Sequence, residues 1–367
     1  MDFKNYLVPG KTGLLIGIGG VSMSPLAEVL HDAGLDIRGS DMAESSNTLT
    51  LREHGIPIHI GHSADNVTDD ISFVIRTAAV HDDNPEVHEA HRRGIPVFER
   101  TQAWGALMRG YQNALCISGT HGKTTTTSMC THIMMAAEKD PTVMIGGTLP
   151  LLKACHRVGK GNTIIMESCE YYNSFLALNP TIAVVLNIEA DHLDFFKDLE
   201  DIKHSFRCFA ERVPAETGTV IANYDDANTM DALRGIARKV ITFGLNAKAD
   251  VYAQNIVHRG SVSEFDIYHR GNYFARVTLH VPGIHNVRNA LAATAAAIVL
   301  GVSPNAVKYG LAGFEGAGRR FDFKGKFQGA DLYDDYAHHP SELRALLDAV
   351  DTLNYQRTIV VFQPHTY

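Results

Sequence analysis

The segment best suited to chemistry is a short glycine-bearing loop between an apolar run and a helical pattern. Residues 114–118 (ALCIS) predict a buried strand, residues 119–124 (GTHGKT) follow it, and a helix is expected over about 124–137. The two glycines let backbone N–H groups turn toward phosphate oxygens, and a helix N-terminus adds partial positive charge. Lys123 can reach the β and γ phosphates, and the Thr124 hydroxyl can bind Mg²⁺. The loop therefore predicts a nucleoside triphosphate site.

This loop is a shortened Walker A motif. The full pattern, G-x-x-x-x-G-K-[ST], would need glycine at position 117, where the chain has Ile117. The alternative is a strand-to-helix turn with an incidental lysine. The strand, the loop, the Lys-Thr pair and the helix occur together and in order, so we favour the phosphate site.

A second glycine loop lies near the N-terminus. Residues 17–22 (GIGGVS) match G-x-G-x-x-G with Ser22 in place of the third glycine, and Asp41 lies 41 − 19 = 22 residues beyond Gly19. An acid at that distance contacts ribose in dinucleotide-binding domains, so this loop alone suggests NAD. The same geometry could hold another pyrophosphate, such as that of a UDP-sugar, which fits better beside a triphosphate loop. A tight turn without a ligand is the third interpretation.

Apolar runs alternate with helical patterns along the first 110 residues. Strands are expected at 14–18, 36–39, 56–60, 73–76 and 96–98, and helices at 24–33, 48–54 and 85–93. This alternation predicts a parallel sheet with helices on its faces.

The rest of the chain predicts two further domains. Between 111 and 317 we expect strands at 114–118, 163–167, 182–187 and 275–281, and helices at 124–137, at 286–300 and after Pro304. Residues 313–318 resemble a linker, and residues 332–336, 340–350 and 358–362 predict a strand, a helix and a strand. A doubly wound domain needs roughly 100 residues, so we expect the third domain to be incomplete in this chain.

Composition excludes several classes of protein. The net charge is 33 − 41 = −8, which argues against general binding of nucleic acid or anionic membranes. No apolar run approaches the length of a membrane span, and the N-terminus lacks the apolar core of a secretory signal. The five cysteines form no CxxC pair, so a reduced cytoplasmic protein is expected. For the oligomeric state, the sequence does not distinguish a monomer from a homodimer.

Several segments resemble the Mur ligases, in the order in which that family carries them. They are GTHGKTTTT (119–127), NIEADH (187–192), PGIHN (282–286), GRRFD (318–322) and DDYAHHP (334–340), and the N-terminal stretch resembles the family's UDP-binding domain. The resemblance covers essentially the whole chain. It implies an α/β fold of three domains: a Rossmann-like UDP-sugar-binding domain (1–110), a P-loop ATPase-like domain (111–317) and the start of a Rossmann-like C-terminal domain (318–367).

The resemblance also implies an activity and its reactants. The family joins a carboxylate to an amine with ATP and Mg²⁺, through an acyl phosphate. The histidine of the GTHGK segment and the acidic segment 166–170 (MESCE) point to UDP-N-acetylmuramate and L-alanine as the substrates. The alternatives are the related activity that adds a recycled murein tripeptide to the same UDP-sugar, and a nucleotide-binding module without catalysis. A dehydrogenase is the last option.

Site residues follow from the resemblance, position by position. Catalytic roles are implied for Lys123, Glu167, His192 and Arg320, and metal binding for Thr124, Glu167 and His192. ATP contacts are implied for Gly119, Thr120, His121, Gly122, Lys123, Thr124, Thr125, Asn286, Asn289, Arg320 and Asp335. UDP-sugar contacts are implied for Gly17, Gly19, Gly20, Ser40, Asp41, His62 and Thr77.

Some of these roles have alternatives. Imidazole is an unusual ligand for a hard cation, so His192 could act through water or on the acyl phosphate instead. Glu170 could place the amino acid or the metal, or have no role in the reaction. Asn286 could be a helix cap. The chain departs from the family's usual residues at Ser22 and at residues 77–79 (TAA).

Overall fold

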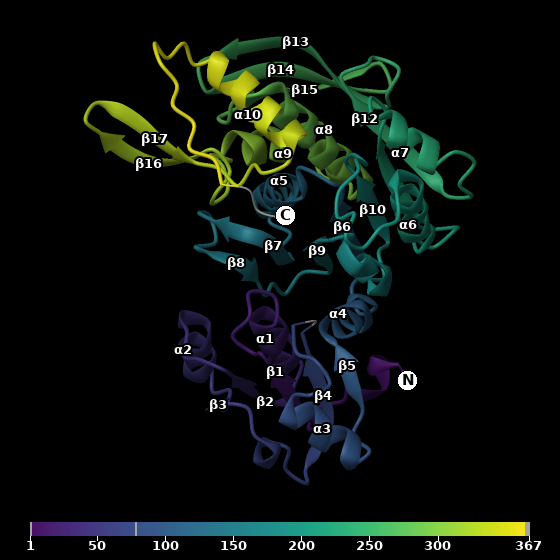
Figure 1. The fold of residues 1–367 in the computed structure, drawn as a ribbon. Helices are drawn as coiled ribbons and strands as arrows, with labels where there is room; N and C mark the ends of the chain where they lie inside the picture. The colour runs from purple at the N-terminus through teal and green to yellow at the C-terminus, as the bar shows by residue number, and fades with distance from the viewer. Residues whose placement is uncertain (1, 78, 364–367) are drawn as a thin grey trace. The chain divides into compact units, whose positions relative to one another are not determined.

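The computed structural model describes residues 2–77 and 79–363. The chain forms two compact units. The first runs from the N-terminus to Tyr111 and includes Ala177–Asn179; the second holds the remaining residues (Figure 1). The boundaries of the three expected domains stay a prediction.

The first unit is built on a parallel sheet with the strand order β3-β2-β1-β4-β5. The strands are β1 (Thr12–Ile16), β2 (Asp36–Asp41), β3 (Ile58–Ile60), β4 (Ile71–Arg76) and β5 (Val97–Glu99). The helices are α1 (Ser24–Asp32), α2 (Ser46–Glu53), α3 (Pro85–Arg92) and α4 (Arg100–Met108). The order runs outward from β1 in both directions, so the glycine loop after β1 lies at the switch point where α/β sheets bind ligands.

The sequence located these elements well. Every predicted strand and helix of the first unit is present, with ends shifted by at most two residues. All five residues of β1 are buried, as expected for a strand of a parallel sheet that is covered on both faces. Helix α4 was not predicted from the sequence. Its buried residues, among them Ala103, Trp104 and Met108, are too few to form a long helical repeat of apolar positions.

The second unit is built on a ten-stranded sheet with the order β15-β14-β13-β12-β11-β10-β6-β9-β7-β8. Its central strands are β6 (Asn113–Ser118), β9 (Thr163–Glu167), β10 (Ile182–Val185), β11 (Thr219–Asn223) and β12 (Lys239–Gly244). The flanking strands are β7 (Thr142–Leu149), β8 (Ala154–Arg157), β13 (Val251–Arg259), β14 (Val262–His269) and β15 (Asn272–Leu279). Pairing is parallel from β7 through β9, β6 and β10 to β13, and antiparallel at β8, β14 and β15.

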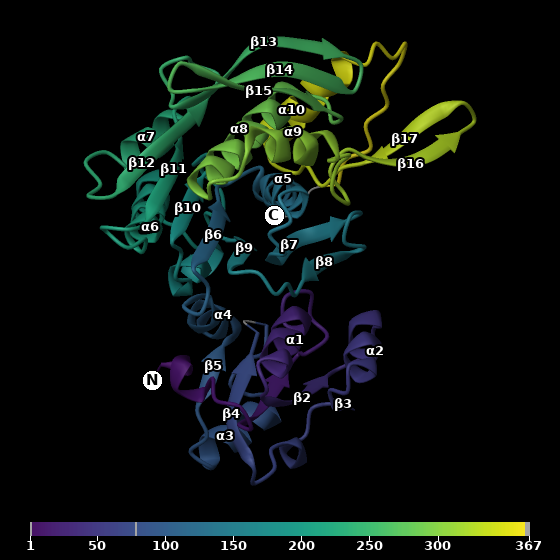
Figure 2. The ribbon, with the colours of Figure 1, turned by 180° about the vertical axis from the view of Figure 1, so that it is seen from behind.

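Helices cover both faces of this sheet (Figures 1 and 2). Helices α5 (Lys123–Ala136), α8 (Ile284–Val299) and α9 (Pro304–Ala312) pack together on one face, and α6 (Leu199–Glu211) and α7 (Ala227–Ala232) cover β10 and β11 on the other. Helix α8 carries many small buried alanines, which let it approach α5 and the sheet closely. The core of the unit lies between these layers.

The C-terminal part contains a hairpin and one helix. The hairpin pairs β16 (Asp322–Phe327) with β17 (Ala330–Asp334), and α10 (Pro340–Asp351) packs on α8. The predicted strand at 358–362 is wrong: these residues adopt no regular structure, and Val361 is 96% exposed. A strand needs a neighbouring strand for its backbone hydrogen bonds, and no described strand lies beside this apolar segment. The described C-terminal part therefore has β16, β17 and α10 as its regular elements.

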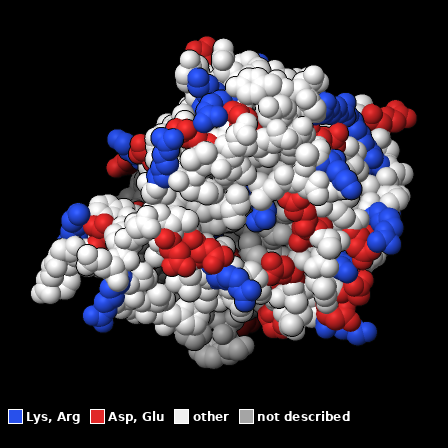
Figure 3. All heavy atoms as spheres, turned by 90° about the horizontal axis from the view of Figure 1, so that it is seen from above, with Lys and Arg blue, Asp and Glu red and all other residues white. Residues whose placement is uncertain are grey.

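Two surface properties bear on the expected partners. Among the described residues, no helix has the length and apolar character needed to cross a bilayer. On the face drawn in Figure 3, Lys and Arg side chains are interspersed with Asp and Glu. The expectation that the protein binds no nucleic acid stays a prediction.

Close packing of α9 on α5 predicts the cost of one added methyl group. A Cβ at Gly310 would lie 2.5 Å from the Ile133 Cα, so the backbone of one of the two helices would have to shift. Gly310→Ala should lower the free energy of unfolding by about 1–3 kcal/mol through overpacking. Gly313→Ala is the matched control, because the nearest atom to its Cβ would be 3.5 Å away. Urea unfolding of both variants measures the difference, and equal stabilities would contradict this account of the packing.

Candidate active site

The phosphate loop lies at the switch point of the second sheet. Strand β6 lies between β9 and β10, and the loop leaves its carboxyl end and enters α5. Gly122 has φ of 84°, and a Cβ there would lie 2.6 Å from the Asn289 Oδ1. Glycine is therefore required at position 122 both for the left-handed backbone and for the close approach of α8. The N–H groups of the first turn of α5 have no partner within the helix and can bind an anion.

Asn187, directly after β10, holds the loop in shape. Its Oδ1 accepts the His121 N–H at 2.8 Å, and its Nδ2 donates to the His121 carbonyl at 3.0 Å. The Thr120 N–H donates to the Asn187 carbonyl at 3.1 Å. The loop is thus fixed by protein contacts on one side, which leaves its other side for phosphate. Asn187 was not among the predicted site residues; its position at the end of a strand beside β6 was the available signal.

Lys123 is mostly but not fully buried, and it has a counter-ion. Its Nζ donates to the Gly119 carbonyl at 2.6 Å and lies 3.0 Å from the Glu170 Oε2. Burial opposes the charge, but the carboxylates of Glu170 and Glu167 hold the pKa of Lys123 above its usual value. Lys123 is therefore charged and close to the loop, where a phosphate would compete with Glu170 for it.

Thr124 and Glu167 bring oxygen ligands together. The Thr124 hydroxyl donates to the Glu167 Oε1 at 3.1 Å, and the Glu167 Oε2 accepts the Gly146 N–H at 2.6 Å. A Cβ at Gly146 would lie 2.5 Å from the Glu167 Oε1, so glycine makes room for this carboxylate. A hydroxyl and a carboxylate beside a phosphate loop fit Mg²⁺, which prefers oxygen ligands and shares them with phosphate.

His192 lies beside the carboxylates of Glu170 and Asp191, each offering a ligand atom within 4.8 Å of the others. The Tyr171 ring stacks on the imidazole, with 4.3 Å between ring centroids, and its hydroxyl donates to Asp194 at 2.5 Å. His192 has φ of 52°, and left-handed non-glycine residues often mark functional sites. The structure thus brings Lys123, Glu170 and His192 to the same edge of the sheet.

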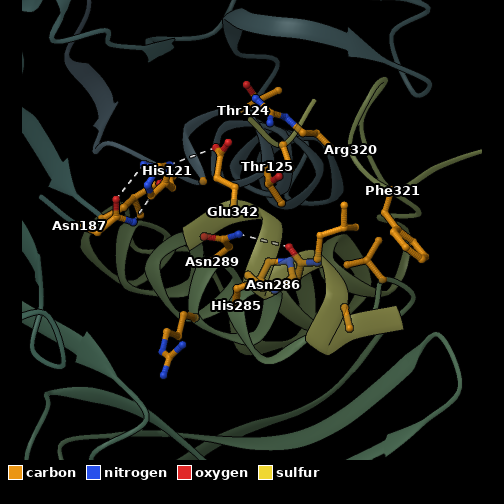
Figure 4. A pocket seen from close by; sticks show the side chains of 18 of the residues that line it. His121, Thr124, Thr125, Asn187, His285, Asn286, Asn289, Arg320, Phe321 and Glu342 are labelled. Atoms are coloured by element: carbon orange, nitrogen blue, oxygen red, sulfur yellow. Dashed lines mark hydrogen bonds and ion pairs between the residues drawn. The ribbon is translucent and has the colours of Figure 1, made fainter. Parts of the chain in front are cut away.

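A cavity of about 370 Å³ opens from the loop toward α8 (Figure 4). The buried Asn286 and Asn289 lie on one face of α8; the Asn289 Nδ2 donates to the Asn286 Oδ1 at 3.2 Å. The cap interpretation of Asn286 is wrong: Gly283 occupies the N-cap, and Asn286 instead donates to the Pro282 carbonyl at 2.7 Å. Other lining residues, which the sequence analysis did not single out, are Asn223, Asp225, Phe243, His285 and Arg288.

Arg320 and Asp335 line the same cavity from the C-terminal part. The Asp335 carboxylate accepts the Phe321 N–H at 2.7 Å and the Ala337 N–H at 2.8 Å. Burial raises the pKa of Asp335, against the effect of these two hydrogen bonds and of Arg320. The carboxylate thus orders the segment that carries Arg320, whose guanidinium lies 5.3 Å from the Tyr336 ring centroid.

The N-terminal glycine loop has its own internal contacts within the first unit. The Asp41 Oδ2 accepts the Gly19 N–H at 2.8 Å, and Asn47 donates to the Gly19 carbonyl at 2.8 Å. Gly17 has φ of 76° and lies next to the Thr77 side chain. Asp41 therefore shapes the loop itself, in addition to any contact with a ribose.

Ser40 and His62 share one buried carboxylate. The Glu86 Oε2 accepts the Ser40 hydroxyl at 2.7 Å and lies 2.8 Å from the His62 Nδ1, and Asn66 donates to its Oε1 at 2.6 Å. Glu86 is fully buried, so it fixes the orientation of both predicted ligand-binding side chains. Sequence analysis missed Glu86, which lies 46 residues from Ser40 along the chain.

The α/β fold and the phosphate loop define a nucleotide-binding class of protein. Comparison with known families agrees with this class. Residues 15–112 match the Mur ligase family catalytic domain, residues 117–297 the Mur ligase middle domain, and residues 319–366 the Mur ligase glutamate ligase domain. The chain belongs to the Mur ligase family. The expected α/β fold and its family are thereby confirmed.

Individual relatives are similar over nearly the whole chain. A UDP-N-acetylmuramate–L-alanine ligase from Agathobacter rectalis is 46% identical over 96% of this chain and 77% of that protein. One from Clostridium novyi is 45% identical over 100% of this chain and 80% of that protein. The crystal structure of UDP-N-acetylmuramate–alanine ligase from Thermotoga maritima is 31% identical with a TM-score of 0.78, covering 93% of this chain and 78% of that one.

The geometry of Gly122 predicts how one methyl group would affect nucleotide binding. Gly122→Ala places a Cβ against Asn289 and strains a backbone with positive φ, which displaces the loop from the phosphates. ATP affinity should fall about 10–100-fold, because a lost hydrogen bond to a charged phosphate costs about 1.5–3 kcal/mol. Gly235→Ala is the control, because Gly235 also has positive φ but has open space around it. Calorimetric titration with ATP measures both; unchanged affinity in Gly122→Ala would refute this role for the loop.

Proposed function

We propose that this protein joins L-alanine to the lactyl carboxylate of UDP-N-acetylmuramate, with ATP as the energy source, in the synthesis of peptidoglycan precursors. The observation that carries this proposal is identity of 45–46% with UDP-N-acetylmuramate–L-alanine ligases over 96–100% of the chain. The phosphate loop, with Lys123 charged and in place, supports it independently of that likeness.

The first step is transfer of the γ-phosphoryl group to the carboxylate. A carboxylate oxygen attacks phosphorus, the bond to ADP breaks, and an acyl phosphate forms. The difficulty is repulsion between anionic groups, so the residues must position and neutralise charge. The loop amides and Lys123 bind the β and γ phosphates, which replace Glu170 as the partner of Lys123. Arg320 adds positive charge from the cavity wall.

Thr124 and Glu167 are the residues that would hold Mg²⁺. When bound, Mg²⁺ neutralises the β and γ phosphate oxygens during transfer. We place His192 on the acyl phosphate side of the site, beside Glu170, either as a further metal ligand or as a direct contact. Asn286 and Asn289 offer amide groups to adenine, which presents both a donor and an acceptor edge.

The second step is attack by the amino group of L-alanine on the acyl carbon. The carbon–oxygen bond to phosphate breaks, phosphate leaves, and the amine loses a proton. The UDP-sugar that carries the carboxylate is held by the first unit, for which we propose Gly17, Gly19, Gly20, Ser40, Asp41, His62 and Thr77.

The related murein peptide activity is the second candidate. A ligase from Neisseria meningitides named for UDP-N-acetylmuramate and L-alanyl-γ-D-glutamyl-meso-diaminopimelate is 26% identical to this chain, with a TM-score of 0.75. The higher identity of the L-alanine ligases favours alanine as the acceptor.

Acceptor choice tests the proposed function directly. The full-length protein should release ADP only when UDP-N-acetylmuramate, L-alanine, ATP and Mg²⁺ are all present. L-alanine should support at least tenfold higher kcat/KM than the murein tripeptide, a difference of about 1.4 kcal/mol in transition-state binding. A coupled assay for ADP measures both rates. Faster turnover with the tripeptide would reverse the assignment, and nucleotide binding without turnover would reduce the protein to a binding module.

Metal dependence tests the roles of Thr124 and Glu167. Glu167→Gln removes the carboxylate charge but keeps its size, and should raise the Mg²⁺ concentration for half-maximal rate by about 10–100-fold or more, since even indirect ligand partners cost that much. Glu216→Gln, on the exposed stretch before β11, is the control. An unchanged Mg²⁺ requirement in Glu167→Gln would place the metal elsewhere.

A further inference from the structure

Three side chains from distant parts of the second unit converge at one wall of the cavity. His121 belongs to the phosphate loop, Glu189 follows β10, and His339 caps the N-terminus of α10. Each offers one ligand atom, and these atoms lie within 4.8 Å of one another. The two imidazole ring centroids are 4.7 Å apart. This cluster is separate from Thr124 and Glu167.

The His121 ring turns an unpartnered nitrogen toward the cluster. Its Nδ1 lies 3.1 Å from the Glu342 Oε1, and its buried Nε2 has no hydrogen-bond partner among the described residues. Glu342 thus holds the ring on its Nδ1 side, and Nε2 faces Glu189. A carboxylate orients metal-binding histidines in the same way.

His339 offers its Nδ1 to the same cluster. This nitrogen accepts the Ser341 N–H in a long hydrogen bond of 3.3 Å, and a metal ion would take the place of that N–H, because the nitrogen has one lone pair. The same Nδ1 lies 3.7 Å from the Glu189 Oε2, and the His121 Nε2 lies 3.6 Å from that oxygen. Both distances are too long for hydrogen bonds. Three potential ligand atoms thus face one another without hydrogen bonds between them.

These separations suit a metal ion. Two ligands at about 2.0–2.1 Å from a tetrahedral ion lie about 3.3–3.4 Å apart, only a few tenths of an ångström less than the distances here. Two imidazoles and one carboxylate are a ligand set of zinc, whereas Mg²⁺ takes oxygen ligands. His121 and Glu189 both line the cavity, so a fourth ligand position would face it.

We propose that His121, Glu189 and His339 form a binding site for a divalent transition-metal ion of the zinc class. The site is additional to the proposed function and does not depend on it. A bound ion would add a direct link between the phosphate loop, the segment after β10 and α10. The Ser341 hydroxyl, which donates to Glu189, already orients the carboxylate for this role.

Metal uptake by the full-length protein tests the site. Co²⁺ should give the visible absorption of a tetrahedral or five-coordinate site. One equivalent of Zn²⁺ per chain should then abolish this absorption, whereas excess Mg²⁺ should not. His339→Gln and Glu189→Gln should each lose this absorption. Glu342→Gln, which loosens the His121 ring and the hydrogen bonds to the His338 and His339 N–H groups, should weaken Zn²⁺ binding about 10–100-fold. Zn²⁺ should also raise the Tm of the unchanged protein.

His338→Gln is the matched control, because His338 precedes His339 but its Nδ1 lies 3.0 Å from the Tyr336 carbonyl. It should bind Co²⁺ and Zn²⁺ like the unchanged protein. Far-ultraviolet circular dichroism of each variant separates loss of ligand from loss of fold. The proposal is overturned if the Co²⁺ signal is absent, if folded His339→Gln and Glu189→Gln both keep it, or if His338→Gln loses it equally.

Discussion

The position of β6 between β9 and β10 is the constraint on which the active site depends. The carboxyl ends of parallel strands lie at the same edge of a sheet. The loop after β6, Glu167 at the end of β9 and Asn187 after β10 therefore meet at that edge. The close approach of α8, which needs glycine at position 122, closes the other side of the loop. The proposed phosphate, metal and base sites thus depend on one arrangement of strands and two helices.

The charge on Lys123 is stabilised by partners within the second unit. A buried ammonium group is costly unless a partner and hydrogen bonds compensate for its lost hydration. Glu170 and the loop carbonyls supply both. Because Glu170 also lies beside His192, exchange of Glu170 for phosphate frees a carboxylate next to the reacting centre. In the proposed mechanism, binding of ATP and preparation of the acceptor side are then one event, which suits a reaction that must gather several anions.

The sequence predicted the strands and helices that follow from a local pattern of residues. The strand at 163–167 matches β9, and the helix at 340–350 matches α10 to within one residue. Contacts set by tertiary structure were missed: Glu342 reaches His121 from 221 residues away, and Glu86 reaches Ser40 from 46 residues away. The strand at 358–362 was predicted from apolar residues alone, but a strand forms only where a neighbour accepts its hydrogen bonds. The resemblance supplied the site residues that spacing could not identify.

The central claim is an acyl phosphate formed on the carboxylate of UDP-N-acetylmuramate, and oxygen transfer tests it most directly. The lactyl carboxylate is labelled with ¹⁸O, the reaction is run with ATP, Mg²⁺ and L-alanine, and the released phosphate is examined by mass spectrometry. The mechanism predicts one ¹⁸O atom in each phosphate, because the carboxylate oxygen that attacks phosphorus leaves with it. Unlabelled phosphate alongside normal product formation would contradict the account.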